Sequence, residues 1–270
     1  MADITTELDL IKSSSYGEQV RTSIVSILTK INNDKILSGL SKLYRGNELG
    51  SGSTYNAAVS ATQKSAISSG NFTNMYIGDY WTINGTVYRI ADINYWKNVG
   101  DTNFTTNHLV LVPDGSLASA SMNSSDITTG AYISSTMYTT ALASIRTRLN
   151  TDFGSYLLSH RRTFPKTVVN GCQSAMAWYN STVDLMNEKM VFGANICCKD
   201  LDGSYLETSD KMQLALFKLN PAMITNARYS YWLLDVASDT NFCRVDGNGA
   251  AVSSSASTSA GIRPVIAVKG

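Results

Sequence analysis

The last forty residues constrain the fold most strongly, because two bulky apolar segments enclose a long run of small polar side chains. Tyr231–Asp235 and Ile262–Ile266 are the apolar segments, whereas residues 237–261 consist largely of Ser, Asn, Gly and Ala. Bulky β-branched and aromatic residues in short runs are typical of buried strands. The pattern therefore predicts a display surface held between buried strands, and it favours binding over a catalytic pocket.

Composition limits the class of protein. With 270 residues and 43% hydrophobic content, the chain is long enough for one substantial core. A net charge of +1 from 22 basic and 21 acidic residues, without a long basic run, argues against a nucleic-acid partner. No apolar stretch approaches the roughly 20 residues that cross a bilayer, and Met1–Asp3 lacks the start of a secretory signal. We expect synthesis in a cytoplasm and no membrane insertion.

The residues that usually carry metal or redox chemistry are few. The four cysteines show no CxxC pair, which predicts buried thiols rather than a disulfide scaffold or a zinc site. His108 and His160 have no metal-ligand spacing, and the polar neighbours of His160 predict a surface position. Adjacent residues on a strand point to opposite sides, so Cys197 and Cys198 do not predict a reactive pair. We expect no catalytic residues, no metal and no cofactor.

Residues 1–45 predict a helical segment for attachment and trimerisation. Thr5–Lys12 and Glu18–Asn33 have helical patterns, and Lys35–Tyr44 can extend them. The second pattern contains a heptad seam of β-branched residues, which favours three strands: Val20, Ile24, Ile27 and Ile31. A single amphipathic helix packed on its own domain explains the same seam equally well. Residues 46–61 are rich in Gly and Ser at their start and predict a flexible connector.

Residues 62–270 predict one α+β domain with mostly antiparallel short strands and one or two helices. Asn84-Gly85 inside an aromatic and β-branched run predicts a hairpin over residues 75–91. Apolar spacing predicts a helix over Tyr138–Asp152 that continues near residues 153–158. The remaining strands are expected at residues 108–113, 167–169, 189–193, 229–234 and 263–268.

Four segments resemble one known family. Asn170–Met186, Met190–Gly193, Tyr231–Leu233 and Gly261–Val265 are similar to C-type-lectin-like domains at the ends of virion proteins from phages of gut Firmicutes. The likeness covers roughly residues 62–270. Separately, Ile4–Leu8 with the Tyr16–Arg21 segment resembles the amino-terminal attachment segment of phage tail and fibre proteins. The resemblance implies a C-type lectin fold. Calcium-dependent sugar recognition is not expected, because the Glu-Pro-Asn type of triplet is absent.

Members of this family are often varied by diversity-generating retroelements, which mutate adenines in Asn codons. Such codons never yield Trp, Met, Gln, Glu or Lys, and Leu233–Pro264 contains none of these five. The resemblance places constant positions at Phe242, Val245, Gly249, Ala256, Ser257 and Gly261. It places the varied, ligand-contacting positions at Asn241, Cys243, Arg244, Asp246, Gly247, Asn248, Ala250, Val252, Ser253, Ser254, Thr258 and Ala260.

The resemblance implies a receptor-binding protein for host attachment, located on the virion at the tail, baseplate or capsid surface. Its expected partners are a glycan or protein receptor on the host cell and other virion proteins that contact the amino-terminal segment, and a homotrimer is expected. Two other functions are compatible with the sequence. One is a structural tail or capsid decoration without a ligand. The other is a glycan-degrading tail enzyme, which the scattered acidic residues disfavour because such enzymes need paired carboxylates.

Overall fold

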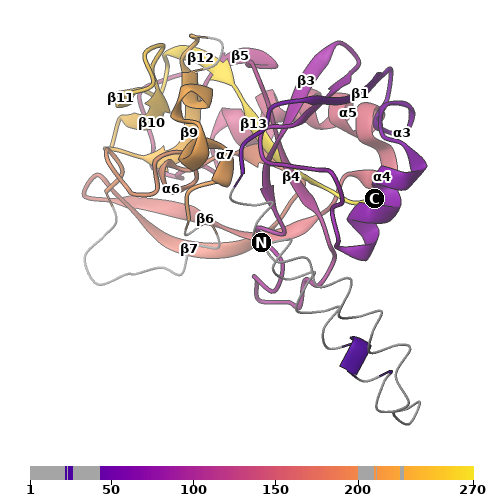
Figure 1. Ribbon diagram of the computed structural model, residues 1–270. Helices are drawn as coiled ribbons and strands as arrows, with labels where there is room; N and C mark the ends of the chain where they lie inside the picture. Colours follow the sequence, from indigo (N-terminus) through magenta and orange to yellow (C-terminus); the bar gives the residue numbers. More distant parts are fainter. Residues whose placement is uncertain (1–21, 23, 27–42, 200–209, 211, 226–227) are drawn as a thin grey trace.

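The computed structural model describes residues 22, 24–26, 43–199, 210, 212–225 and 228–270, and it has an α+β fold with three sheets (Figure 1). The α+β expectation is therefore confirmed. In Figure 1 a five-stranded sheet lies on the left, a six-stranded sheet on the right, and a long hairpin runs beneath both. None of the helices in the described ranges is long and apolar enough to span a membrane.

The six-stranded sheet contains most of the fully buried strands. Its order is β1 (Glu48–Gly52), β2 (Tyr80–Ile83), β3 (Thr86–Ile93), β4 (Leu109–Pro113), β13 (Pro264–Val268) and β8 (Val183–Leu185). All neighbours are antiparallel except β1 and β2. Asn84 and Gly85 have φ of 49° and 74°, the left-handed pair that a tight hairpin turn requires, so the predicted hairpin is confirmed.

The five-stranded sheet carries the carboxyl-terminal segment. Its order is β11 (Ala251–Ser255), β10 (Asn241–Val245), β9 (Tyr231–Val236), β12 (Ser259–Ile262) and β5 (Ala118–Ser121). Every residue of β9 is buried, as is every residue of β13 in the other sheet. Arg263 alone separates β12 from β13, so the chain passes from one sheet to the other within a single residue.

A long hairpin and short helices complete the domain. Strands β6 (His160–Val169) and β7 (Cys172–Ser181) pair over their whole length, and Asn170-Gly171 forms the turn. The helices are α3 (Tyr55–Ala58), α4 (Ala61–Ser69), η1 (Met137–Ala141), α5 (Leu142–Phe153), η2 (Gly154–Tyr156), α6 (Glu188–Phe192), α7 (Ala215–Leu219) and η3 (Pro221–Thr225). Helix α5 buries Leu142, Ile145 and Leu149, the side chains whose spacing predicted it.

Three expectations from the sequence are wrong. The domain has more than the one or two helices expected, since residues 62–270 contain α5, α6, α7 and most of α4. Residues 189–193 form helix α6 instead of a strand, because the Asn187 side chain caps its start at Met190 N (2.7 Å) and Gly193 ends it at φ 83°. Residues 46–61 are not a flexible connector, since they contain β1, α3 and the start of α4. The glycines there serve close packing: a Cβ on Gly50 would lie 2.3 Å from the carbonyl oxygen of Ala58.

The predicted amino-terminal helices lie almost entirely outside the described residues. Val20, Ile27 and Ile31 of the predicted seam are outside them, whereas Ile24 lies in a helical turn with Val25 and is 36% exposed. No coiled coil is evident in the part of the chain that the structure describes. Trimerisation through this seam stays a prediction. At the end of the segment, Tyr44 forms a bridge with Ile77 rather than continuing a helix.

Tyr55 offers a test of whether residues 46–61 belong to the folded domain. Its ring is fully buried against Trp81, Phe153 and Tyr156, and its hydroxyl donates to the carbonyl of Lys269 (3.0 Å). We expect Tyr55→Ala to lower the free energy of unfolding by about 3 kcal/mol or more in urea titrations, as large-to-small core substitutions do. Ser53→Ala changes an exposed residue nearby and should stay within about 0.5 kcal/mol of the original protein. Equal stability of the two variants would contradict the assignment.

Candidate ligand-binding surface

The β10–β11 hairpin forms one edge of the five-stranded sheet and contains most of the positions predicted to contact a ligand. Its strands pair from Asn241 with Ser255 to Val245 with Ala251. The connecting turn is stabilised by Asp246, whose carboxylate accepts from Ala250 N (2.9 Å) and Asn248 N (2.8 Å). These backbone donors, Ala250 first, hold the pKa of Asp246 below its usual value. Asp246 is therefore engaged in shaping the turn.

The structure brings most of the twelve predicted positions to the surface of this hairpin and its flanks. Ten are exposed or half-exposed: Asn241, Arg244, Asp246, Gly247, Asn248, Ala250, Val252, Ser253, Ser254 and Thr258. Two are buried, namely Cys243 (0% exposed) and Ala260 (5%). The expectation of surface side chains is corrected for these two.

The burial of Cys243 has a local cause. The register of β10 against β9 shifts between Phe242 and Arg244, so the simple alternation of inward and outward side chains fails there. Phe242 and Cys243 are both buried as a result. Burial raises the pKa of the Cys243 thiol, which keeps it neutral and unreactive.

The positions predicted to be constant serve the framework under the hairpin. Phe242, Val245 and Ala256 are fully buried. Gly249 has φ 89°, and a Cβ on Gly261 would lie 2.0 Å from Ser116 Oγ. Ser257 is exposed, and its backbone N–H binds Asp126. Buried or conformationally demanding positions thus alternate with exposed ones along the segment.

Beside the hairpin lies an open pocket of about 440 Å³ that the sequence analysis missed, apart from Ala260. It is lined by Gly115, Ser116, Ala118, Ser119, Tyr229, Ser230, Ser259, Ala260 and Gly261. Three chain segments build it, from the β4–β5 loop, the approach to β9 and strand β12, so no single motif reveals it. Arg244 Nη1 donates to Ser230 Oγ (3.3 Å) and links the hairpin to the pocket.

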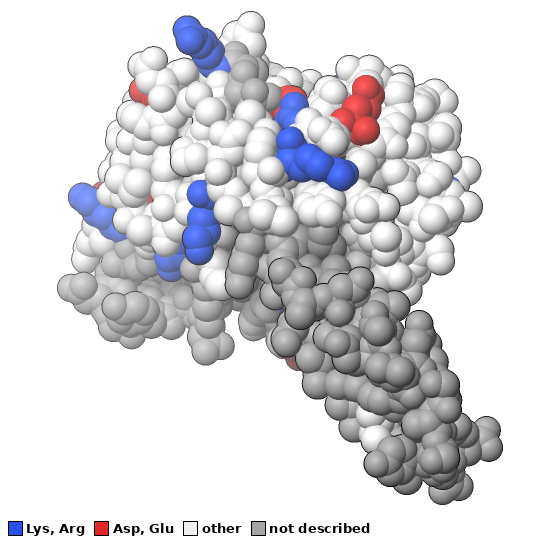
Figure 2. Space-filling model, viewed as in Figure 1, with Lys and Arg blue, Asp and Glu red and all other residues white. Residues whose placement is uncertain are grey.

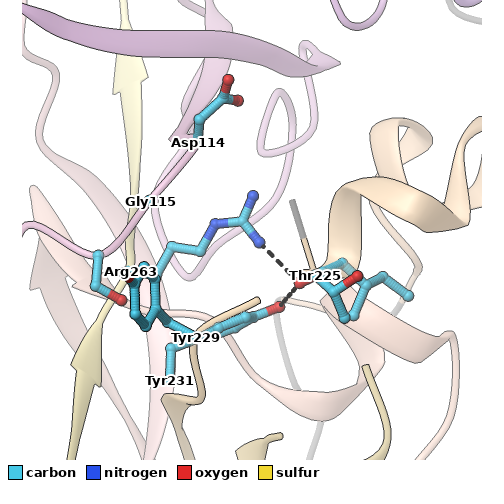
Figure 3. Close-up of a pocket in the computed structure, with 8 residues that line it drawn as sticks. Asp114, Gly115, Thr225, Tyr229, Tyr231 and Arg263 are labelled. Atoms are coloured by element: carbon cyan, nitrogen blue, oxygen red, sulfur yellow. Dashed lines mark hydrogen bonds between the residues drawn. The ribbon is translucent and has the colours of Figure 1, made fainter. Parts of the chain in front are cut away.

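A cavity of about 10 Å³, large enough for one water molecule, shares Gly115, Ser116 and Tyr229 with this pocket. Arg263 forms part of its wall (Figure 3). Arg263 Nε donates to the carbonyl of Pro113 (2.9 Å), and Nη1 donates to the carbonyls of Met223 (3.1 Å) and Ile224 (3.2 Å). The Tyr231 hydroxyl also donates to the Ile224 carbonyl (3.1 Å).

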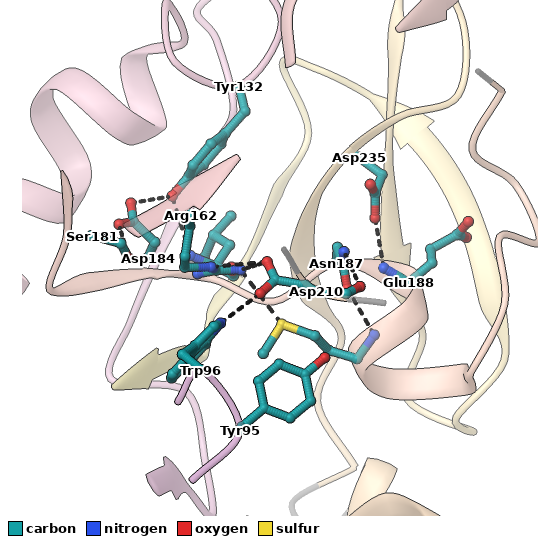
Figure 4. Close-up of polar contacts among 12 residues, drawn as sticks. Tyr95, Trp96, Tyr132, Arg162, Ser181, Asp184, Asn187, Glu188, Asp210 and Asp235 are labelled. Atoms are coloured by element: carbon teal, nitrogen blue, oxygen red, sulfur yellow. Dashed lines mark hydrogen bonds and ion pairs between the residues drawn. The ribbon is translucent and has the colours of Figure 1, made fainter. Parts of the chain in front are cut away.

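A second group of polar side chains lies in the core (Figure 4). Arg162 pairs with Asp210 (2.7 Å), which also accepts from Trp96 Nε1 (2.7 Å). Asp184 accepts from Tyr132 (2.9 Å), Ser181 (2.7 Å) and Arg146. Each of these charges is paired and, Arg146 apart, almost fully buried, so these contacts stabilise the core.

Glu188 holds the chain that follows α6. Its buried carboxylate accepts the consecutive backbone N–H groups of Ile196 (2.8 Å), Cys197 (3.0 Å) and Cys198 (2.9 Å). Desolvation and this carboxylate raise the pKa of Cys197, which disfavours a reactive thiolate. The cysteine pair is thus placed as part of a packed turn.

Three aspartates in the carboxyl-terminal segment serve separate structural purposes. Asp235 accepts from Glu188 N (2.6 Å), Asp239 accepts from Gly171 N (2.9 Å), and Asp246 stabilises its own turn. Within the described ranges, no group of three His, Cys, Asp or Glu residues is arranged to hold a metal ion.

On the face in Figure 2, basic side chains are scattered among uncharged atoms rather than gathered in a continuous tract.

The two histidines lie in the core, which corrects the surface position expected for His160. His160 stacks on Trp96 with ring centroids 3.9 Å apart, and His108 Nε2 accepts from Trp96 N (3.2 Å). Desolvation lowers the pKa of His108 to about 4 and that of His160 well below its usual value. Because both rings are neutral in the folded state, their stabilising contribution is complete above about pH 6.5 and is lost as the pH falls toward 4.

We therefore expect acid sensitivity that depends on His108. Between pH 7 and 4.5 its protonation should cost about 2 kcal/mol of unfolding free energy, measured by urea titration at each pH. His108→Gln should show a shallower loss over the same range. Desolvation also raises the pKa of Asp92 to about 6, and this group stabilises the fold at low pH and loses that effect as the pH rises. Since the two pH dependences have opposite signs, comparison with the variant isolates the part that His108 contributes. Identical pH slopes for the two proteins would contradict the prediction.

Comparison with known proteins gave no match to any family model, any curated protein or any solved structure.

Proposed function

We propose that this chain is a phage virion protein whose carboxyl-terminal domain has a C-type-lectin-like fold and attaches the particle to the host cell. The observation that carries the proposal is that the β10–β11 hairpin has separate sets of buried and exposed side chains. Phe242 and Val245 are fully buried, whereas Asn248 and Ser253 are exposed on the same hairpin. The surface can thus vary without loss of the core.

The strand next to the hairpin holds the exposed side chains in place. Strand β9 pairs directly with β10 and is buried at all six positions, so the hairpin rests on a rigid base. Trp232 Nε1 donates to the carbonyl of Ala120 (3.0 Å) and ties this base to β5 across the sheet. A ligand-contacting surface on rigid strands loses little conformational entropy on binding.

The chemistry of the exposed positions suits weak, adaptable contact. Ser253, Ser254 and Asn248 have short side chains that offer hydrogen bonds at low entropic cost. Each site would bind weakly alone. Three copies on a trimer, docked through residues 1–45, and many trimers on a particle would raise the effective affinity through multivalency.

Binding to host cells tests the proposal. Full-length protein, labelled with a fluorophore, is expected to bind cells of the strain on which the phage grows and to compete with the intact phage. Asn248→Ala combined with Ser253→Trp removes a polar contact and places a bulky ring on the exposed surface. We expect cell binding to fall about tenfold or more, which corresponds to about 1.4 kcal/mol.

The control repeats the same chemistry elsewhere. Asn150→Ala combined with Ser144→Trp alters two exposed positions on α5 and should bind cells as the original protein does. Unchanged binding of the hairpin variant would overturn the location of the surface. Absence of cell binding by the original protein would support a decoration without a ligand, and release of reducing sugar from host glycans would indicate an enzyme.

A further inference from the structure

Most of the described arginines in this domain are paired with an aspartate, and three are not. Six of the described arginines form an ion pair with an aspartate: Arg45 with Asp79, Arg89 with Asp114, Arg146 with Asp184, Arg148 with Asp152, Arg161 with Asp101, and Arg162 with Asp210. Among the other described arginines, Arg228, Arg244 and Arg263, none has a carboxylate within 4.0 Å in the part of the chain that the structure describes.

Two of these arginines contact the open pocket or the cavity that shares part of its lining, and the third is next to a pocket residue in the chain. Arg263 lines the cavity, Arg244 donates to the pocket residue Ser230, and Arg228 precedes the pocket residue Tyr229. The hairpin turn also reaches this place, since a Cβ on Gly247 would lie 2.8 Å from the Arg228 carbonyl oxygen. Among the described residues, two arginines without a carboxylate partner are therefore at the cavity and at the edge of the pocket, and the backbone of the third lies beside the hairpin turn.

Arg263 is the most informative of the three, because it is only 2% exposed. Its guanidinium lies over the rings of Tyr231 (5.1 Å) and Phe217 (5.5 Å), and its Nε and Nη1 atoms bind carbonyl oxygens. No hydrogen bond from Nη2 occurs within the described residues, and in Figure 3 the terminal nitrogen without a dashed line extends toward the side of Asp114.

Carbonyl dipoles satisfy N–H groups but do not neutralise a buried cation. Removing a guanidinium from water without a counter-charge costs several kcal/mol. Asp114 lines the same cavity, but its two oxygens are held by Arg89 Nε and Nη2. The cavity thus presents a cation that an external anion could neutralise, with room for about one oxygen atom.

The open pocket in front of this cavity offers unoccupied hydroxyl groups. The side-chain hydroxyls of Ser116, Ser119, Ser259 and Tyr229 form no hydrogen bond within the described residues. Tyr229 is 70% exposed, so its ring face can contact a ligand. A volume of about 440 Å³ is within the range of small-molecule sites.

We propose that this pocket binds a hydroxylated ligand that carries an oxyanion, such as an acidic sugar or a polyol phosphate of a cell-surface polymer; its biological setting rests on the proposed function. One anionic oxygen enters the cavity beside Arg263, and the ligand hydroxyls meet the serines. The ring of Tyr229 covers the apolar side of the ligand. Arg244 and Arg228 add attraction from the hairpin side and from the solvent side.

Binding of small probes to the full-length protein tests this site directly. Calorimetric titrations use sodium glucuronate, glycerol 3-phosphate and glucose. Glucuronate has a carboxylate that glucose lacks, so these two sugars test the contribution of the negative charge. We expect at least one of the two anions to bind, with glucose at least about tenfold weaker, since a charge-assisted hydrogen bond is worth about 1.5–3 kcal/mol. The preferred anion distinguishes an acidic sugar from a polyol phosphate. Failure of both anions to bind at up to about 50 mM, a concentration well above the roughly millimolar range of weak ligands, would overturn the proposal.

Substitutions locate the site. Arg228→Gln and Arg244→Gln should each weaken binding of the preferred anion by about fivefold or more, and higher salt should weaken binding in the original protein. Arg161→Gln removes an equal charge from a half-buried position on β6 and should leave anion binding unchanged. Equal effects of all three substitutions, or no effect of the first two, would overturn the site.

These results are separable from those for host attachment. Anion binding is measured without cells, so it can succeed when attachment fails. If the hairpin variant loses cell binding while the anions do not bind, the attachment proposal stands and the pocket proposal falls. The Arg263→Lys variant is informative only where circular dichroism shows the native spectrum, and in that case anion binding should also fall.

Discussion

The structure depends on the position of Arg263 between two sheets. Strand β12 ends at Ile262 and strand β13 begins at Pro264, so one residue joins the five-stranded sheet to the six-stranded sheet. The guanidinium holds this junction by binding carbonyls from the end of β4 and from η3. The surface that we propose as a binding site is therefore fixed to the main core, rather than carried on a free loop.

The core supports this junction with charged groups as well as apolar ones. Arg162 is fully buried and joins Asp210 to the Leu185 carbonyl, while Glu188 fixes three consecutive N–H groups. Breaking a buried pair of this kind is costly because it leaves an uncompensated charge. Such groups favour one arrangement of β6, β8 and α6 over alternatives with similar apolar burial.

Much of the domain was predictable from the sequence where local signals and packing agree. Asn84-Gly85 fixed the β2–β3 turn, and the spacing of Leu142, Ile145 and Leu149 identified α5. Prediction failed where the same residue type is found in two different structural settings. Gly50 in a serine-rich stretch indicated flexibility, but it permits close contact with the carbonyl of Ala58.

The candidate site was predictable only in part. The family resemblance indicated the positions on the hairpin, and most of them are exposed or half-exposed, but a register shift buried Cys243. The pocket brings Ser116, Tyr229 and Ser259 together from three separate segments, and only the folded chain shows that they are neighbours. The sequence also did not predict that Arg263 has no ion-pair partner among the described residues, since ion pairs can be identified only once the fold is known.

The hairpin has a further property that follows from its place in the sheet. Among the described strands, β11 pairs on one side only, so its other edge presents unpaired backbone groups. That edge carries Ser253, Ser254 and Ser255 and lacks the charged residues or prolines that commonly block edge-to-edge association. Large β-branched or aromatic side chains at Val252 or Ser254 would promote aggregation between copies of this protein, which sets an upper limit on the hydrophobicity of this surface.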